Sequence, residues 1–441
     1  MKKLKNVLLT LLSVACLGTA AVGFAGCGDE ATSSPEAGNS NVASSFSSDS
    51  SSVEEDKGKG PSEGLKFTLN EDGISYSVTG IGTCTDTDII IPAIHNELPV
   101  TAIGWRAFFS CSKLTSIEIP ESVAAIGYDA FSYCYALKDI EVNEENTIYK
   151  DIEGNLYTED GTTLLQYAIG KTETEFVIPD SVTKIGYGAV AYCISLTDIE
   201  IPDGVTEIGA GAFKNCNGLT SIVIPEGVTK IGDMAFESCR NLASIEIPDG
   251  VNTIRENTFA CCDRLANVVI GKGVTTIEAS AFHYCYGLTS IVIPDSVTKI
   301  GDKTFRECTN LTSVVIGDNV VTIGDAAFSL CSRLESINIP DSVTEIDRET
   351  FSLCGLVSIE IPDSVTKIGD SAFFECSCLT SIGIPDSVTT IGNFAFIGCT
   401  KLTSITFDGT VAQWNAIEKG DDWKSGVPAT EVVCKDGVVS L

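Results

Sequence analysis

Apolar and polar residues alternate along this chain in a pattern that returns every 23 residues in most repeats. In one repeat, Ile222 and Ile224 are separated by a single outward position, which is the period of a half-buried β-strand. Pro225 then ends the predicted strand, because proline cannot donate a hydrogen bond to a strand ladder. Val228 and Ile231 predict a second, shorter strand. The hydrophobic pattern therefore predicts a repeated unit of two strands.

A phenylalanine followed three residues later by a cysteine closes nearly every repeat, as Phe236 and Cys239 do in the same unit. We expect this pair to lie in a single helical or 3₁₀ turn, which is too short to be stable alone. Gly232 precedes the pair, and glycine recurs there in most repeats, so we expect a positive φ to be preferred at this position.

One unit has too few apolar side chains to offset the entropy of ordering its own backbone, so the units have to stack. A period between 20 and 50 residues is typical of solenoids and other arrays. The predicted fold is a β-rich solenoid in which the strands of successive coils lie parallel and short helical or 3₁₀ turns complete each coil. Twelve coils of about 4.8 Å each give a body about 60 Å long.

The repeats extend over residues 102–406. We expect modified ends on both sides, an N-terminal cap at 65–101 and a C-terminal cap at 407–441, because an uncovered apolar coil face would aggregate. The segments on either side of the repeats keep strand-like runs but lose the full pattern. The chain is therefore predicted to hold one long repeat domain rather than several globular domains.

One interval breaks the period, because Cys134 and Cys193 are 59 residues apart, 36 more than one repeat. The extra residues predict a widened coil at 135–178. Within it, Asp160 and Gly161 form a two-residue signal that is typical of a β-hairpin turn. We expect a flap or a functional loop in this interval.

The N-terminus predicts an export signal over residues 1–26, with lysines at the start, an apolar run and then small residues. The residues from Phe24 to Cys27 resemble a bacterial lipobox, in which the cysteine is diacylated and becomes the new N-terminus. Two acyl chains hold a protein on a membrane where one does not. Ordinary secretory cleavage and an uncleaved anchor are the alternatives. Residues 27–64, rich in serine, are predicted to be a disordered tether. We expect an extracytoplasmic protein that is lipid-anchored at the bacterial cell surface.

The net charge is −32, from 28 Lys and Arg against 60 Asp and Glu. Such a chain repels phosphate backbones, so we predict no nucleic-acid partner. The two histidines, His95 and His283, have no evident nucleophile partner, and no cysteine pair has the spacing of a zinc site. We therefore predict no catalytic residue, no metal and no cofactor, and expect that the protein is not an enzyme.

Most of the 18 cysteines occupy one point of the repeat, beside the phenylalanine column. An exported chain with so many cysteines would ordinarily contain disulfides. In stacked coils the Cα atoms come close enough for a bridge, but the Cβ vectors run parallel rather than toward each other. We therefore predict a buried ladder of free thiols.

A column of acids follows the turn proline in most coils, at Glu121, Asp180, Asp203, Glu226, Asp249, Asp295, Asp341, Asp363 and Asp386. Parallel stacking would bring these carboxylates together, where like charges repel. A ladder of divalent cations is one interpretation. The other is that the acids stabilise the turn by accepting hydrogen bonds from nearby backbone.

The outward position of the first strand gives the candidate site. Its column reads Glu118, Glu141, Glu200, Val223, Glu246, Val269, Val292, Val315, Asn338, Glu360, Gly383 and Thr406. Exposed contiguous apolar surface often marks a partner site. The alternative is that valine simply favours strands. The predicted ligand-binding residues are Val223, Glu246, Val269, Val292 and Val315.

The repeat resembles the BspA-like class of leucine-rich repeats, as Leu379 to Ile382, Ile384-Pro385, Ile391-Gly392, Phe396 and Cys399 illustrate. The resemblance implies a right-handed stack of coils and a bacterial surface protein that mediates adhesion. It also implies a protein partner from the host, the matrix or a neighbouring cell. A surface glycan-binding module and a structural spacer without a specific ligand are the alternatives.

Overall fold

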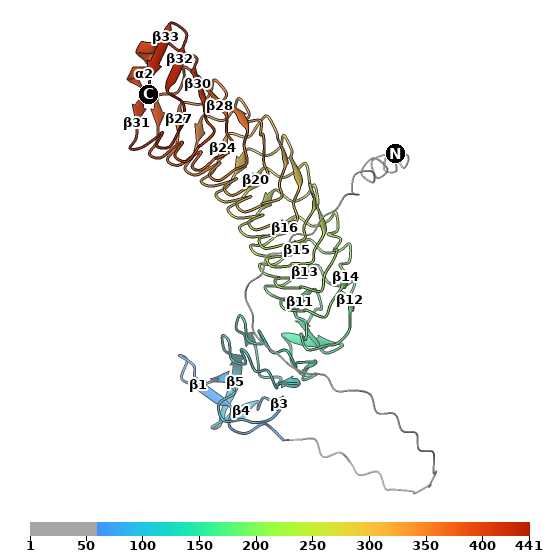
Figure 1. Cartoon of the computed structure of the whole chain (residues 1–441). Helices are drawn as coiled ribbons and strands as arrows, with labels where there is room; N and C mark the ends of the chain where they lie inside the picture. The colour runs from blue at the N-terminus through green and yellow to red at the C-terminus, as the bar shows by residue number, and fades with distance from the viewer. Residues whose placement is uncertain (1–59) are drawn as a thin grey trace, which may run out of the picture. The chain divides into compact units, whose positions relative to one another are not determined.

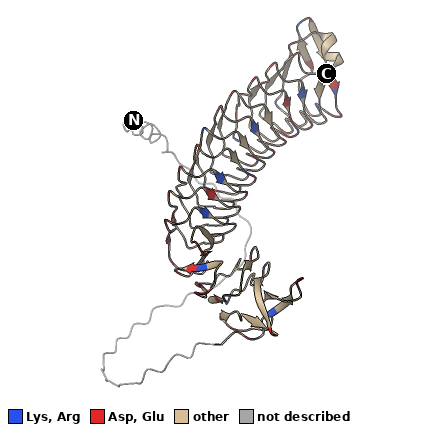
Figure 2. Ribbon diagram, turned by 180° about the vertical axis from the view of Figure 1, so that it is seen from behind, with Lys and Arg blue, Asp and Glu red and all other residues tan. Residues whose placement is uncertain are grey.

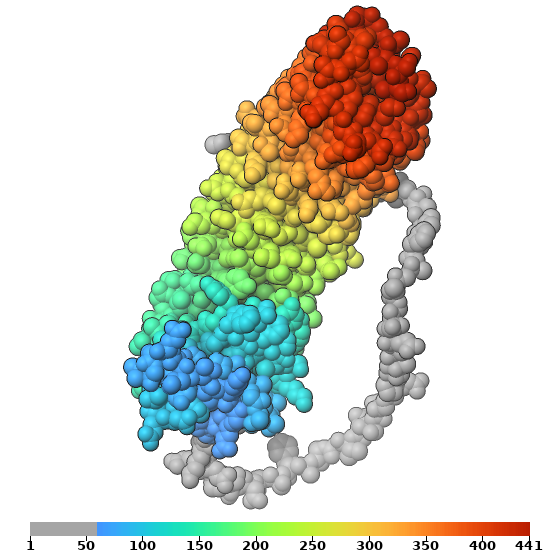
Figure 3. All heavy atoms as spheres, turned by 90° about the vertical axis from the view of Figure 1, so that its left-hand side faces the viewer, coloured from blue at the N-terminus to red at the C-terminus, as the bar shows by residue number. Residues whose placement is uncertain are grey.

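The computed structural model describes residues 60–441. Two rows of parallel strands and one row of turns build coils that stack on one another (Figure 1). The successive coils follow the order of the sequence along this stack (Figure 3). The predictions for the export signal, for Cys27 and for most of the serine-rich tether lie outside the described residues. The predicted β-solenoid with parallel strands is confirmed.

The first row of strands carries the alternating pattern. In β21 (Ser290–Ile293), Ile291 and Ile293 are buried and Val292 is exposed. This strand pairs in parallel and in register with β23 (Ser313–Ile316). The other strands of the row are β3 (Asp88–Ile90), β6 (Ser116–Ile119), β8 (Asp139–Val142), β12 (Glu175–Val177), β14 (Asp198–Glu200), β17 (Ser244–Ile247), β19 (Asn267–Ile270), β26 (Ser358–Glu360), β28 (Ser381–Ile384), β30 (Ser404–Phe407) and β32 (Glu431–Cys434).

The second row consists mainly of two-residue strands, and most of them have one buried isoleucine. In β22 (Lys299–Ile300), Ile300 is buried and pairs with Ile277 and Ile323 of the neighbouring coils. The other strands are β7 (Ala125–Ile126), β13 (Lys184–Ile185), β15 (Glu207–Ile208), β16 (Lys230–Ile231), β18 (Thr253–Ile254), β20 (Thr276–Ile277), β24 (Thr322–Ile323), β25 (Glu345–Ile346), β27 (Lys367–Ile368), β29 (Thr390–Ile391) and β31 (Glu418–Lys419).

The first row is less continuous than the hydrophobic pattern predicts. Ile222 and Ile224 are buried as expected, yet residues 221–224 form no strand. Asn338 contributes a single bridge to Glu360 instead of a strand. Alternation specifies which side chains are buried, whereas a ladder also requires neighbouring backbones within hydrogen-bond distance. The prediction of a strand at 222–224 is therefore wrong, although its burial pattern is confirmed.

The third side of each coil is a row of turns rather than the predicted helical or 3₁₀ turn. Two residues per coil are left-handed, for example Met234 with φ 57° and Ser238 with φ 60°. Backbone N–H groups here donate to the next coil, as Phe236 donates to Thr258 at 2.9 Å. Gly232 does not have a positive φ, so that prediction is wrong. Glycine fits there because an added Cβ would lie 2.3 Å from the backbone nitrogen of Ala210 in the preceding coil.

The phenylalanine column forms the centre of the core. Phe259 is fully buried and stacks on Phe236 and Phe282 with ring centroids 5.4 Å apart on both sides. The file continues in the same way from Phe213 to Phe396. Val190 takes the place of the ring in the coil after the long interval. The stacking that the 23-residue period predicts is therefore confirmed.

The long interval contains three antiparallel strands, β9 (Tyr149–Ile152), β10 (Asn155–Thr158) and β11 (Thr163–Gln166). The hairpin predicted at Asp160-Gly161 joins β10 to β11, and Gly161 is left-handed with φ 68°. The β11 strand then pairs in parallel with β13. One strand of the insertion, β11, is therefore part of the second row.

Both ends of the described chain depart from the repeat. At the N-terminal end, β1 (Lys66–Leu69), β2 (Tyr76–Gly80), β4 (Ile94–His95) and β5 (Leu98–Ile103) form a sheet that continues into β7. At the other end, the helix α2 (Val411–Ala416) begins with a capping box of Thr410 and Gln413. Its Trp414 is buried against Phe407, and β33 (Gly437–Ser440) closes the last sheet by antiparallel pairing. Each end therefore covers an apolar coil face, as an array requires.

Candidate functional site

The structure places the predicted valines on one exposed face. Val223, Val269, Val292 and Val315 are between 55% and 79% exposed, although valine is normally a core residue. Val292 and Val315 are direct partners in the parallel ladder, and Glu246 is the partner of Val269. We call these four valines with Glu246 the valine stripe. The outward column that the sequence predicts therefore exists as a line of side chains.

Part of the valine stripe lines a groove. Val223, Glu246 and Val269 border a hollow of about 440 Å³ between the turn prolines Pro225 and Pro248. Val292 and Val315 lie in the next coils, beyond this hollow. The coil of Val223 lacks a ladder strand, so its outward side chain is the most exposed of the four. The groove therefore borders only the first part of the valine stripe.

Two exposed valines extend the outward column beyond the predicted residues. Val177 is 65% exposed and pairs with Glu200, and Val433 pairs with Thr406. Both lie next to interruptions of the period, one at the end of the insertion and one in the C-terminal cap. The signal for Val177 is present in the sequence, because Phe176, Ile178 and Pro179 reproduce the strand and turn of a regular repeat.

Two acids of the column after the turn proline, Asp249 and Asp295, accept a hydrogen bond from the next coil. An oxygen of Asp249 accepts from the backbone N–H of Lys272 at 2.7 Å, and Asp295 accepts from Asp318 at 3.3 Å. Within residues 60–441, the structure groups no three His, Cys, Asp or Glu side chains into an arrangement that could hold a metal ion. At Asp249 and Asp295, these contacts support the interpretation in which the acid stabilises the turn by accepting from nearby backbone.

Opposite charges also pair between neighbouring coils at two places on the second row of strands. Lys184 lies 3.1 Å from Glu207 of the next coil, and Lys367 lies 3.2 Å from Glu345. Figure 2 shows basic and acidic residues following one another on these strands. Each exposed pair contributes about 0 to 1 kcal/mol to stability, so the pairs limit repulsion rather than hold the coils together.

The cysteines of the repeat are free thiols in a buried ladder, as predicted. The thiol of Cys308 donates to the carbonyl of Phe282 in the preceding coil at 3.2 Å, and Cys331 donates to Phe305 at the same distance. Burial raises the pKa of Cys308 to about 12 and that of Cys331 well above its ordinary value. A thiol that stays protonated is a poor nucleophile and metal ligand, so the ladder has a structural role.

No helix of the described chain is both long enough and apolar enough to span a bilayer. The comparison with curated proteins found no match.

Among solved structures, the described coils are similar to a leucine-rich repeat protein from Bacteroides ovatus. The two chains are 27% identical, the similarity covers 84% of this chain and 93% of that one, and the TM-score is 0.54. A leucine-rich cell surface protein from Faecalibacterium prausnitzii is also 27% identical, over 81% of this chain and 96% of that one, with a TM-score of 0.45.

The sequence model of the BspA type leucine-rich repeat region matches six times, over residues 74–158, 167–289, 275–354 and 298–417. The matches cover both sides of the insertion and most of the stacked coils, which agrees with the period, the phenylalanine file and the two strand rows. The chain therefore belongs to the BspA type leucine-rich repeat family.

Proposed function

We propose that this protein binds another protein through the valine stripe, as a surface-anchored adhesion or interaction module. The observation that carries the proposal is the exposure of Val269, Val292 and Val315 in three adjacent coils, at a position where other coils have glutamate. Apolar surface of this kind, bordered by polar residues, is typical of protein interfaces. Membership of a leucine-rich repeat family supports a binding role in general. The partner we expect is a protein of the host, the matrix or a neighbouring cell.

The chemistry of the stripe favours a protein over a glycan at this face. The outward column has valines, acids and small polar residues, and no aromatic ring that could stack on a sugar. Glu246 lies beside Val269 in the ladder, so a partner with an apolar anchor and a nearby basic group fits this segment. Binding energy at a protein interface is concentrated in a few fully desolvated contacts near its centre, so the valines would act by receiving an anchor side chain of the partner.

The test compares capture of proteins from matrix, cell-surface and cell-wall extracts by the wild-type chain and by the triple variant Val269→Glu, Val292→Glu, Val315→Glu. The exposed side chains make few core contacts, so the variant should fold, although each pair of opposing glutamates that it creates should cost about 0.2 to 1 kcal/mol. The matched control is Val321→Glu, because Val321 is 51% exposed but lies outside the outward column. Loss of a specific partner in the triple variant alone supports the proposal. Equal capture by all three proteins means that the valines reflect strand propensity only.

We also propose that Cys27 carries the lipid anchor that holds the protein at the cell surface. The lipobox resemblance and the family support an extracytoplasmic location. In cells fed a labelled fatty acid, the wild-type protein should incorporate the label and stay with the membrane fraction. Cys27→Ser should do neither. A wild-type protein without label would instead indicate ordinary secretory cleavage or an uncleaved anchor.

A further inference from the structure

The insertion opens a break between two coils of the solenoid, and we call this break the seam. On the second row, β7 pairs with β5 on one side, and within the described chain no strand pairs with its other side. In the row of turns, the backbone N–H of Phe108 donates to the carbonyl of Ala130 in the next coil, and Val190 donates to Ala212 in the same way. Among residues 60–441, no backbone hydrogen bond of this kind joins the coil of Ala130 to the coil of Val190. The buried core also divides into two clusters here, with Leu156 in one and Tyr157 in the other.

Tyrosine side chains bridge the seam where the backbone ladder is missing. The rings of Tyr128 and Tyr187 meet edge to face with centroids 5.0 Å apart. Tyr133 and Tyr192 lie 4.3 Å apart, and their hydroxyl groups share a hydrogen bond of 2.9 Å. The two coils are therefore neighbours in space, although 59 residues separate the equivalent positions in the sequence.

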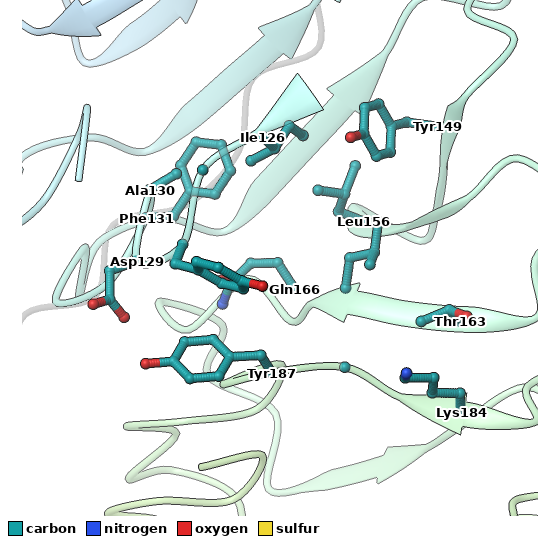
Figure 4. Close-up of a pocket in the computed structure, with 14 residues that line it drawn as sticks. Ile126, Asp129, Ala130, Phe131, Tyr149, Leu156, Thr163, Gln166, Lys184 and Tyr187 are labelled. Atoms are coloured by element: carbon teal, nitrogen blue, oxygen red, sulfur yellow. The ribbon is translucent and has the colours of Figure 1, made fainter. Parts of the chain in front are cut away.

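A cavity of about 390 Å³ lies inside the seam (Figure 4). Its apolar lining includes Ile126 of β7, Phe131 and Leu156, and Tyr187 borders it. Figure 4 shows the Tyr149 hydroxyl and the Gln166 side chain among these apolar groups. This size falls within the range of about 300 to 1,000 Å³ that is usual for small-molecule pockets. The lining combines apolar side chains with a comparable share of polar groups, among them Thr163, Gln166 and Lys184.

The aromatic residues at the seam are exceptional for their place in the repeat. Tyr128 and Tyr187 at the seam, and Trp105 of the preceding coil, all lie three residues before the phenylalanine position, and they are between 50% and 70% exposed. The equivalent position in later coils holds mostly small or acidic residues, such as Asp233 and Asp302. A purely structural turn does not require aromatic residues here, since the other coils form the same turn without them.

The charged groups around the cavity are already neutralised by partners outside it. Both oxygens of Asp129 have partners, one in Arg106 at 3.4 Å and one in the hydroxyl of Ser132 at 3.1 Å. Lys184 is paired with Glu207. The cavity therefore offers no free charge to an ionic ligand, and the net charge of −32 repels anions. An uncharged ligand with hydroxyl groups fits best.

We propose that the seam cavity binds a sugar ring of a neutral glycan, with Tyr128 and Tyr187 as the stacking surface. The face of an aromatic ring is electron-rich and attracts the polarised C–H groups of a pyranose. The side chain of Gln166 donates to the carbonyl of Tyr167 at 2.8 Å, which leaves its own carbonyl oxygen free to accept from a sugar hydroxyl. The edge-to-face contact of the two tyrosines leaves no space between their rings, so a quaternary ammonium ion could not be enclosed there.

The test is titration of the full chain with maltose, cellobiose, lactose and N,N′-diacetylchitobiose, followed by calorimetry or ligand-observed NMR. Sialyllactose and choline serve as charged comparisons. At least one neutral disaccharide should bind with a Kd near 1 mM or below, which corresponds to about 4 kcal/mol of binding free energy. Sialyllactose and choline should bind at least tenfold more weakly.

Three variants separate binding from structure. Tyr128→Ala should weaken binding at least tenfold, and Tyr128→Phe should keep most of it, because the ring is retained. Tyr286→Ala is the matched control, since Tyr286 is an exposed tyrosine of a coil far from the seam in the sequence. Thermal unfolding of each variant shows whether the seam stays intact. The proposal is wrong if no neutral sugar binds at about 10 mM, or if Tyr128→Ala and Tyr286→Ala bind equally well. It is also wrong if choline or sialyllactose binds more tightly than every neutral sugar.

Discussion

Replacing Phe282 with alanine tests whether the coils are stable only as a stack. Phe282 is fully buried, and its ring stacks on Phe259 at 5.4 Å and on Phe305 at 5.5 Å. Removing a buried phenylalanine side chain costs about 3 to 5 kcal/mol, because it loses apolar burial and leaves a cavity. Stacked rings contribute about 0.5 to 1.5 kcal/mol per pair beyond burial. With a ring on each side, we expect a loss of about 4 to 5 kcal/mol for Phe282→Ala.

Two comparison variants make the magnitude informative. Phe108 is equally buried but stacks on one ring only, at 6.0 Å, so Phe108→Ala should cost about 3 kcal/mol, at the lower end of the range. Phe394 is 41% exposed, and Phe394→Ala should cost less than about 1 kcal/mol. All three variants replace phenylalanine with alanine, so the order of their losses in unfolding free energy depends on burial and ring stacking rather than on residue type.

The assay is urea unfolding followed by far-ultraviolet circular dichroism, together with amide hydrogen exchange. In an array, each repeat is stabilised by its neighbours, so Phe282→Ala should also lower protection in the coils of Phe259 and Phe305. A loss below about 1 kcal/mol, or exchange that changes in the substituted coil alone, would refute the stacking argument.

Three further predictions follow from buried side chains. Burial raises the pKa of Cys308 to about 12, so this thiol should not react with Ellman's reagent at pH 8 in the folded protein. The partly exposed Cys378 should react. Equal reaction rates of the two thiols would contradict the buried ladder. Burial lowers the pKa of His283 to about 4, so the unfolded chain binds a proton that the folded chain does not between about pH 6.5 and 4. The free energy of unfolding should therefore fall as the pH drops through this window, and His283→Gln should reduce that fall by about 1 to 3 kcal/mol. If the urea midpoint changes equally between pH 7 and pH 4.5 in the wild type and the variant, His283 does not cause the pH dependence. Trp414→Ala should destabilise the C-terminal cap by about 3 to 5 kcal/mol, with hydrogen exchange rising first in β30 and β32. Uniform exchange along the array would count against a local cap.

Within the regular coils, the sequence is sufficient to predict which side chains are buried. The period specifies the phenylalanine file, the free thiols beside it and the outward valines, because all of these repeat at fixed positions in the coil. The conformation of the backbone cannot be predicted from the sequence in the same way. The left-handed residues Met234 and Ser238 are ordinary L residues, so no glycine signal marks them. Glycine fits at position 232 because the backbone of the preceding coil approaches closely, and no single-sequence pattern separates that cause from a positive φ.

The seam could not be predicted from the sequence, because it depends on how strands that are distant in the sequence pair. Tyr128 and Tyr187 occupy the same repeat position, but the 59-residue spacing does not show that their coils become neighbours. That contact depends on where β11 joins the second row, and β11 carries no 23-residue signature. The hairpin turn at Asp160-Gly161 is predictable from local chemistry, whereas the cavity beneath it results from the pairing of distant strands.

The departures from the repeat are where specific recognition can arise in this solenoid. A regular array presents the same chemistry on every coil, so a partner would find equivalent positions along its whole length and no defined register. The valine stripe changes one outward column from acids to apolar residues over a few coils, which supplies a register on the first row. The seam removes the ladder between two coils, which leaves a cavity bordered by Tyr128 and Tyr187, at a position where the later coils have no aromatic residue. Because the two features lie on different rows of the coil and share no residue, substitutions in one should leave binding at the other unchanged.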